Sequence, residues 1–419
     1  MKDTVMNGGR LGRGASFALL VVATVLMMAA SSVPSPFYPL YLQRWGLSVT
    51  TLTVVFAVYV AGLLVALLTV GSLSDHIGRR PVLAASLLVA AGGTAVFLAA
   101  DGVAALVVAR IVQGVAAGTA TGALAAGLVE LAPARRPRRG PTMTAVGTSF
   151  GLAVGGGVAG LLVQVSERPD RYVFAVLTLA FVVLAALVLA LPETSTGCTG
   201  ALASLRPRVR VPVRTRAEFV AAVPAIVAGW SVTGLFLALA PSLVSDVLHV
   251  HFGAAGSLGI AVLFLANSAG GLWSARYAAP TATLLGSVAL TVGAAGLAGA
   301  LATASAPVFL GGAVVSGLGV GLTFNGTLRG ISEATEAPSR SEVFSAAYVV
   351  SYAALSLPSL AAGRAVPVWG LATTGYLYIA GVAALSVGAA VHTAHRHAAP
   401  LPAPRAHAIE KGTTCTPSP

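Results

Sequence analysis

Hydrophobic residues occur in twelve long runs that are separated by short polar segments. A helix needs about 20 mainly apolar residues to cross a bilayer. Glycine and proline inside such runs are tolerated because neighbouring helices satisfy the freed backbone groups. The pattern therefore predicts twelve membrane-spanning helices, over residues 15–40, 50–71, 81–100, 104–131, 141–165, 172–192, 218–241, 251–273, 281–302, 306–328, 343–363 and 370–392.

The composition excludes a water-soluble protein. Only 9% of the 419 residues are charged, 56% are hydrophobic and the mean hydropathy is +0.88. A soluble globular protein carries roughly 25% charged residues. The excess comes from small and aliphatic residues, including 48 glycines, which suits closely packed helices in lipid. The chain is predicted to be an all-α membrane protein.

The first run has a second interpretation. Lys2, Arg10 and Arg13 precede it, and Ala29-Ala30-Ser31 resembles a signal-peptide cleavage site. The apolar run continues to about Leu40, which is long for a signal peptide. We therefore expect a short N-terminal segment, residues 1–14, followed by an uncleaved first helix.

The net charge of +12 raises the question of a nucleic-acid partner. With the N-terminus placed inside, 20 of the 25 basic residues lie on the cytoplasmic side and four lie in the outer loops. This asymmetry follows the positive-inside rule and places both termini in the cytoplasm. The same asymmetry removes the case for a nucleic-acid partner. Nearly all basic residues are arginine, which together with abundant alanine and glycine predicts a bacterial source, with the inner membrane as the location.

Two halves of the chain resemble each other. The segment from Gly71 to Pro81 matches that from Gly270 to Pro280 at an offset of 199 residues, and the fourth and tenth helices share paired glycines. Repeated halves are typical of transporters. We expect two pseudo-symmetric six-helix bundles, residues 15–192 and 218–392, a basic cytoplasmic linker over 193–217, and a disordered cytoplasmic tail over 393–419.

A motif lies between the second and third helices. It reads Gly71-Ser72-Leu73-Ser74-Asp75-His76-Ile77-Gly78-Arg79-Arg80-Pro81-Val82-Leu83. This loop resembles the signature G-x-L-x-D-[R/K]-x-G-R-[R/K]-x-x-L of the major facilitator superfamily, with histidine where a basic residue is usual. The fourth helix carries Arg110-Ile111-Val112-Gln113-Gly114-Val115-Ala116-Ala117-Gly118, which resembles the second motif of that superfamily. The resemblance implies its twelve-helix fold and transport by alternating access.

The resemblance also implies that the loop gates the transporter. Asp75 would face the start of the eleventh helix, near Glu342, in the outward-open state and release it in the inward-open state. Arg79 could pair with the carboxylate at the cytoplasmic end of the fourth helix. The alternative is that these charges only anchor the loop. The gating candidates are Gly71, Asp75, Gly78, Arg79, Arg80 and Glu130.

Arg110 is the one basic residue well inside a predicted helix. Such a charge costs at least about 2.5 kcal/mol at the helix centre. It would either contact substrate or the proton path, or snorkel to the membrane surface. Mid-helix polar and aromatic residues are scarce, which favours an uncharged or amphiphilic substrate, although each is also compatible with packing. The path candidates are Arg110, Gln113, Tyr59, Trp230, Asn267, Asn325 and Tyr352.

Closely spaced glycines in the fifth helix bear on the direction of transport. They resemble the glycine-rich motif of drug/proton antiporters, but Leu152 replaces its proline. The same spacing occurs in ordinary helix packing. The pattern favours export over uptake only weakly. The predicted packing glycines are Gly114, Gly118, Gly151 and Gly155.

The energy source has few candidates. All 13 acidic residues fall in loops or at helix ends, so proton coupling would rely on Asp75, Glu130, Asp246, His249 or His251. The ATP-binding pattern G-x-x-x-x-G-K-[ST] is absent. The two cysteines, Cys198 and Cys415, form no metal motif.

These features predict a transporter that is not an enzyme and has no cofactor or metal. It would be a monomer in the lipid bilayer that moves a small organic molecule by alternating access. Proton-coupled efflux by an antiporter is the expected mode. The alternatives are an uptake carrier, a facilitated uniporter and a non-transporting membrane sensor.

Overall fold

The computed structural model describes residues 11–195, 201–207, 209–248, 254–336 and 339–398. Within these ranges, twelve helices are long and apolar enough to cross a membrane, as predicted. The first span combines α1 (Arg13–Ser32), η1 (Ser35–Phe37) and α2 (Tyr38–Trp45). The other spans are α3 (Val49–Val70), α5 (Arg79–Leu98), α6 (Val103–Leu131), α7 (Arg139–Val165), α8 (Pro169–Val188), α10 (Val213–Ala238), α12 (Ala254–Ser274), α13 (Ala279–Thr303), α14 (Ala306–Glu333), α15 (Arg340–Trp369) and α16 (Leu371–Ala398). Three short helices connect spans: α4 (Leu73–Ile77), α9 (Ala201–Ser204) and α11 (Ala240–Asp246).

Some predicted boundaries differ from the structure. The first helix, expected to be continuous over 15–40, is interrupted at Pro34 and Pro36, because proline cannot donate the backbone hydrogen bond that continues a helix. The helix after the linker begins at Val213 rather than at 218, and the last helix continues to Ala398 rather than ending at 392. Cys198, Cys415, His249 and His251 lie outside the described residues.

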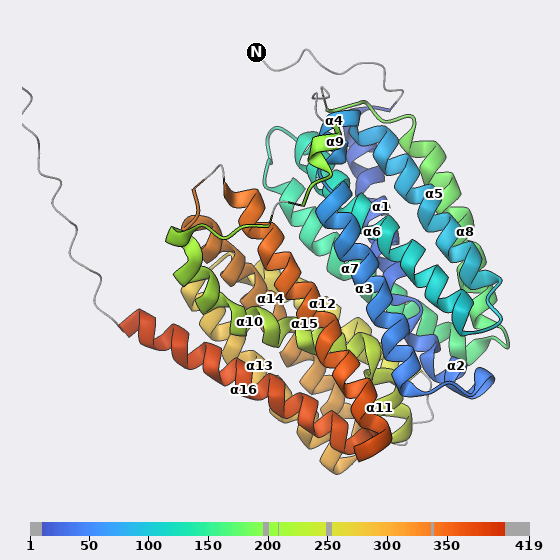
Figure 1. The fold of residues 1–419 in the computed structure, drawn as a ribbon, viewed down its shortest axis with the longest axis vertical. Helices are drawn as coiled ribbons and strands as arrows, with labels where there is room; N and C mark the ends of the chain where they lie inside the picture. The colour runs from blue at the N-terminus through green and yellow to red at the C-terminus, as the bar shows by residue number, and fades with distance from the viewer. Residues whose placement is uncertain (1–10, 196–200, 208, 249–253, 337–338, 399–419) are drawn as a thin grey trace, which may run out of the picture.

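The spans form two bundles with the same internal arrangement (Figure 1). In the first bundle, α3 and α5 pack on α6, and α8 packs on α5. In the second bundle, α12 and α13 pack on α14 in the same way, and α16 packs on α13. The structure therefore shows the predicted pair of pseudo-symmetric six-helix bundles.

Equivalent glycines allow equivalent close contacts in the two bundles. A Cβ atom at Gly114 of α6 would overlap the carbonyl oxygen of Tyr59 in α3. A Cβ atom at Gly317 of α14 would overlap the carbonyl oxygen of Leu263 in α12. Glycine is needed at such positions because the two backbones touch. The same kind of backbone contact occurs at the other predicted packing glycines, Gly118, Gly151 and Gly155.

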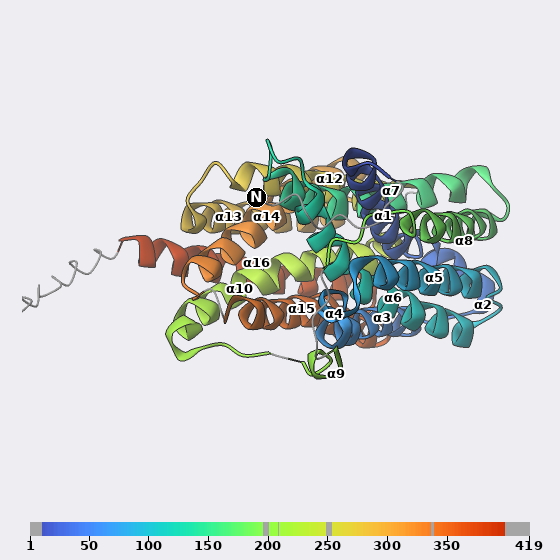
Figure 2. The ribbon, with the colours of Figure 1, turned by 90° about the horizontal axis from the view of Figure 1, so that it is seen from above.

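The bundles contact each other through α7 and α12 and through α3 and α15. We call the end that carries the α3–α5 loop, residues 71–78, the motif end. Near the opposite end, Thr50 of α3 donates a hydrogen bond to the carbonyl of Gly363 in α15 (2.5 Å), and Gly156 of α7 packs on Ile260 of α12. Figure 1 shows the bundles close together there and diverging toward the motif end, and Figure 2 shows them side by side from above.

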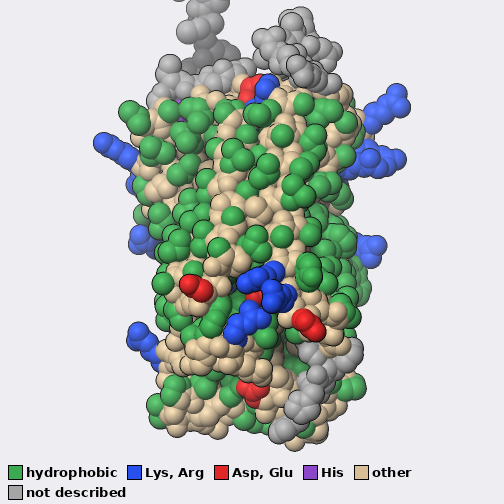
Figure 3. All heavy atoms as spheres, turned by 90° about the vertical axis from the view of Figure 1, so that its right-hand side faces the viewer, with side chains coloured by type: hydrophobic (Ala, Val, Ile, Leu, Met, Phe, Trp, Pro, Cys, Tyr) green, Lys and Arg blue, Asp and Glu red, His purple; other side chains and the backbone are tan. Residues whose placement is uncertain are grey.

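The outer face of the first bundle is suited to lipid. Val176 and Leu179 of α8 and Leu88 of α5 each leave more than half of their surface exposed. Figure 3 shows hydrophobic side chains spread over this face, with charged side chains at its top, along its flanks and in a cluster in its lower half. The apolar surface fits the hydrocarbon core of a bilayer, since charged groups are costly there.

Candidate functional site

The turn between α4 and α5 is shaped by Gly78. Its φ angle of 105° lies in a region that residues with a side chain rarely adopt. A Cβ atom at this position would lie 2.7 Å from Oε2 of Glu193. Glycine therefore permits both the turn and the close approach of a carboxylate to the start of α5.

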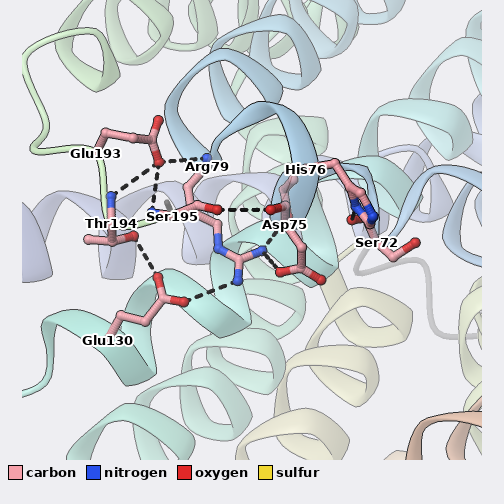
Figure 4. A network of polar contacts seen from close by, with 9 residues as sticks. Ser72, Asp75, His76, Arg79, Glu130, Glu193, Thr194 and Ser195 are labelled. Carbon is pink, nitrogen blue, oxygen red and sulfur yellow. Dashed lines mark hydrogen bonds and ion pairs between the residues drawn. The ribbon is translucent and has the colours of Figure 1, made fainter. Parts of the chain in front are cut away.

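Arg79 connects three helices at the motif end (Figure 4). Its Nη1 lies 2.5 Å from Oδ1 of Asp75 in α4 and donates to the Ser74 hydroxyl at 2.6 Å. Its Nη2 lies 3.1 Å from Oε1 of Glu130 at the end of α6. The predicted Arg79–Glu130 ion pair is confirmed. Arg79 is largely covered, with 13% of its side chain exposed, whereas Asp75 is 52% exposed.

Glu193 completes this network, and the sequence analysis missed it. Its Oε1 accepts a hydrogen bond from the backbone N–H of Arg79 (2.8 Å), and its Oε2 accepts one from that of Arg80 (3.1 Å). These are the first N–H groups of α5, which have no partner within the helix and favour a negative charge. The signal that could have found Glu193 is an acid directly after the sixth hydrophobic run, on the side of the motif loop.

The residues after Glu193 extend the network. The Thr194 hydroxyl donates to Oε2 of Glu130 (2.5 Å), and the Ser195 hydroxyl donates to the backbone carbonyl of Asp75 (3.0 Å). His76, at the position where a basic residue is usual, lies 3.2 Å from the Ser72 carbonyl through Nδ1. The segment after α8 therefore ties α4 and α6 together, in addition to capping α5.

We expect Glu193→Ala to reduce the stability of the protein by about 0.5–2 kcal/mol, the usual cost of losing a helix N-cap. Glu193→Gln should cost less because the amide oxygen can still accept one of the backbone hydrogen bonds. Thermal unfolding of the purified variants provides the measurement. Glu336→Ala is the matched control, since that side chain is 74% exposed and pairs with the exposed Arg214 at 3.3 Å. Equal melting temperatures for Glu193→Ala and Glu336→Ala would contradict the capping role.

Arg110 is completely buried inside the first bundle, with 0% of its surface exposed. Its Nη1 donates to the carbonyl of Ser31 (3.1 Å) and to Oε1 of Gln113 (2.9 Å), and its Nη2 donates to the Tyr38 hydroxyl (2.6 Å). Gln113 in turn donates to the carbonyl of Ala30 (2.7 Å). The guanidinium does not snorkel to the surface; it joins α6 to α1 and α2.

Three aromatic rings surround the same guanidinium. The Arg110 Cζ atom lies 5.2 Å from the ring centroid of Tyr59, 5.7 Å from that of Tyr38 and 5.8 Å from that of Phe97. Such cation–π contacts strengthen when the cation is desolvated. Tyr59 belongs to α3, which also contacts the second bundle. The cluster therefore links Arg110 to the interface between the bundles.

A second aromatic cluster lies in the other bundle. The ring of Trp230 in α10 lies 5.3 Å from that of Phe324 in α14 and 5.1 Å from that of Tyr352 in α15, both edge-on. Tyr352 belongs to α15, which contacts α3, the helix of Tyr59, across the two bundles. Within the described part of the chain, the buried Nε1 of Trp230 has no hydrogen-bond partner. Phe324 was not predicted, because an apolar ring inside a hydrophobic run carries no sequence signal.

The two predicted asparagines have different surroundings. Asn267 of α12 donates to the Ser149 hydroxyl of α7 (3.3 Å), which joins the two bundles. Asn325 donates to the carbonyl of Gly321 in its own helix (2.9 Å). Of the two, the structure places Asn267 at the interface between bundles. Across the described ranges, no group of three His, Cys, Asp or Glu side chains is placed to hold a metal ion.

Comparisons with known proteins agree with this geometry. The family described as Major Facilitator Superfamily matches residues 20–359. A solved structure with a similar fold is that of a bacterial homolog to the human lysosomal transporter Spinster, in an inward-facing and unoccupied conformation. The TM-score is 0.72 at 14% sequence identity, covering 92% of this chain and 96% of that chain. The search of curated proteins gives no match.

Proposed function

The chain belongs to the major facilitator superfamily, and on that premise we propose that it is a secondary transporter that exports a small organic molecule in exchange for protons. The family and the fold support transport of a substrate across a membrane. The observation that carries the proposal is the pair of equivalent bundles joined near one end and bearing a charged network at the other. Two such bundles can rock about a shared site.

The motif end faces the cytoplasm in this proposal, in the inner membrane of a bacterial cell. The support is the concentration of arginine in the loops at that end, together with the positive-inside rule. Both termini are then cytoplasmic, and the bundle contact at Thr50 and Gly363 lies on the outer side. This arrangement corresponds to a conformation that is closed to the outside.

Asp75 acts as the latch between conformations. In the present conformation it pairs with Arg79, and half of its side chain is exposed. When the bundles close at the motif end, the carboxylate engages the N-terminal end of α15, where unpaired N–H groups and the helix dipole favour a negative charge. Glu130 holds the Arg79 side chain and Glu193 holds the start of α5 while Asp75 changes its partner.

The substrate binds between the two aromatic clusters. Trp230 offers an indole N–H that has no partner among the described residues, and Tyr352 and Tyr59 belong to α15 and α3, which contact each other across the bundles. A ligand with an apolar or aromatic surface and one hydrogen-bond acceptor fits these groups, which supports an uncharged or amphiphilic substrate. Asn267 and Asn325 complete the proposed path. Arg110 and Gln113 act through Tyr59, because the Arg110 guanidinium packs against the Tyr59 ring.

Proton coupling rests on the carboxylates at the motif end. Asp75 and Glu130 share Arg79, so protonation of either would weaken its own ion pair with that guanidinium and shift Arg79 toward the other carboxylate. Uptake and uniport by the same fold are the rival modes, and a non-transporting sensor is the rival class. In this proposal the protein works as a monomer.

A panel of resistance and uptake measurements in cells expressing the chain tests the proposal, followed by transport assays in reconstituted vesicles. Cells that express the wild-type chain should accumulate less of the transported compound than cells that lack it. In vesicles, an imposed pH gradient should accelerate movement of the compound. Asp75→Asn should slow transport severalfold, whereas Asp101→Asn, in the loop at the opposite end, should not. A transport rate that does not depend on the pH gradient would contradict proton coupling and favour uniport. Binding of a solute without its transport would favour the sensor.

A further inference from the structure

A groove of about 760 Å³ lies between α10 and α16, on the outer surface of the second bundle and away from the bundle interface. Its walls include Val220 and Pro224 of α10 and Leu385 and Gly388 of α16. Val220 is 60% exposed and Leu385 is 37% exposed, so these apolar side chains face the surroundings of the protein. The volume is in the range of about 300–1,000 Å³ that is usual for small-molecule sites.

One end of the groove is basic. His392 and Arg396, in the last turns of α16, line it at the motif end. Arg396 is 48% exposed at its side chain, and its Nη1 lies 2.8 Å from Oε2 of Glu218 in α10. A guanidinium has five N–H donors, so this ion pair leaves donors for a further anion. Figure 1 shows α16 along the edge of the second bundle, with its last turns extending away from the other helices.

We propose that this groove is a binding site for an anionic phospholipid, separate from the substrate path. One acyl chain occupies the apolar part between α10 and α16, and the phosphate group binds Arg396 and His392. The chemistry of the groove matches such a molecule, because an apolar channel ends in a cationic group near the end of a membrane-spanning helix. Basic pockets between such helices are known to bind anionic lipid head groups.

Native mass spectrometry of the purified full-length chain tests the site, with phosphatidylglycerol and phosphatidylcholine of identical acyl chains as probes. Phosphatidylglycerol should bind more tightly. Arg396→Gln should weaken its binding about fivefold, the ratio that corresponds to about 1 kcal/mol per basic residue. Glu218→Gln breaks the same ion pair but removes the competing negative charge, so it should leave binding unchanged or tighter. Equal weakening by both variants would show that the ion pair is only structural and would overturn the proposal.

A second pair of variants tests the apolar part of the groove. A Cβ atom at Gly388 or at Gly381 of α16 would have no neighbouring atom within 4 Å, so a larger residue can begin at either position without a backbone clash. Gly388 lines the groove and Gly381 does not. Gly388→Leu should therefore remove the tightly bound phosphatidylglycerol, whereas Gly381→Leu should retain it, with both variants folded by thermal unfolding. Retention of the lipid by Gly388→Leu, or equal affinity for the two lipids, would refute the site.

Discussion

A disulfide between α7 and α12 is expected to stop transport reversibly. A Cβ atom at Gly157 of α7 would lie 3.3 Å from Cβ of Ala261 in α12, close to the roughly 3.5–4.5 Å found in disulfides. The variant Gly157→Cys/Ala261→Cys, made with Cys198→Ser and Cys415→Ser, would join the two bundles covalently. If transport requires the bundles to rock against each other, oxidation should lower the rate at least about tenfold, because the contact can no longer open. Transport in vesicles before and after reduction provides the measurement.

The control for this experiment is a disulfide within one bundle. A Cβ atom at Gly330 of α14 would lie 3.9 Å from Cβ of Ala279 in α13, and both helices belong to the second bundle. Oxidation of Gly330→Cys/Ala279→Cys should leave transport intact, since it does not link the bundles. An oxidised Gly157→Cys/Ala261→Cys protein that transports as fast as the reduced one would contradict alternating access through this interface.

Most of the fold could be predicted from the sequence, because in a membrane protein a long apolar run is enough to indicate a spanning helix. Every long apolar run forms a membrane-spanning helix. The errors concern helix ends and interruptions, which the pattern of polar and apolar residues does not indicate. Pro34 and Pro36 interrupt the first span, yet prolines elsewhere, such as Pro224 in α10, lie inside a continuous helix. Whether a proline ends a membrane helix depends on which neighbours satisfy the freed carbonyl groups, and those neighbours come from tertiary packing.

The candidate site could be predicted only where its residues follow a local pattern. Asp75 and Arg79 belong to one short motif and are four residues apart, so the sequence already places them close together on either side of the Gly78 turn. Glu193 is 114 residues away from Arg79, and its contact with the start of α5 depends on how α8 packs against α5. The surroundings of Arg110 could not be predicted from the sequence either. Its hydrogen-bond partner Tyr38 lies in the interrupted part of the first span.

Replacement of Arg110 is expected to cause the largest loss of stability in the molecule. Arg110→Ala would leave the Tyr38 hydroxyl, the Gln113 side chain and the Ser31 carbonyl without a donor in a buried site, and would open a cavity between three aromatic rings. A buried acceptor left without a donor typically costs about 1–3 kcal/mol, and the cavity adds to this loss. Arg110→Lys should recover only part of this loss, because one ammonium group cannot reproduce the planar fork that reaches these acceptors.

Equilibrium unfolding of the purified variants measures the effect, with Arg171→Ala as the control. Arg171 is an exposed arginine near the start of α8, and its replacement should change the unfolding free energy little. Transport by the folded fraction then separates two roles for Arg110. A purely structural residue would lower the amount of active protein and leave KM unchanged, whereas one that positions Tyr59 in the substrate path would raise KM, since the ring loses its support. An Arg110→Ala protein as stable as Arg171→Ala would show that the buried guanidinium does not hold α6 to α1 and α2.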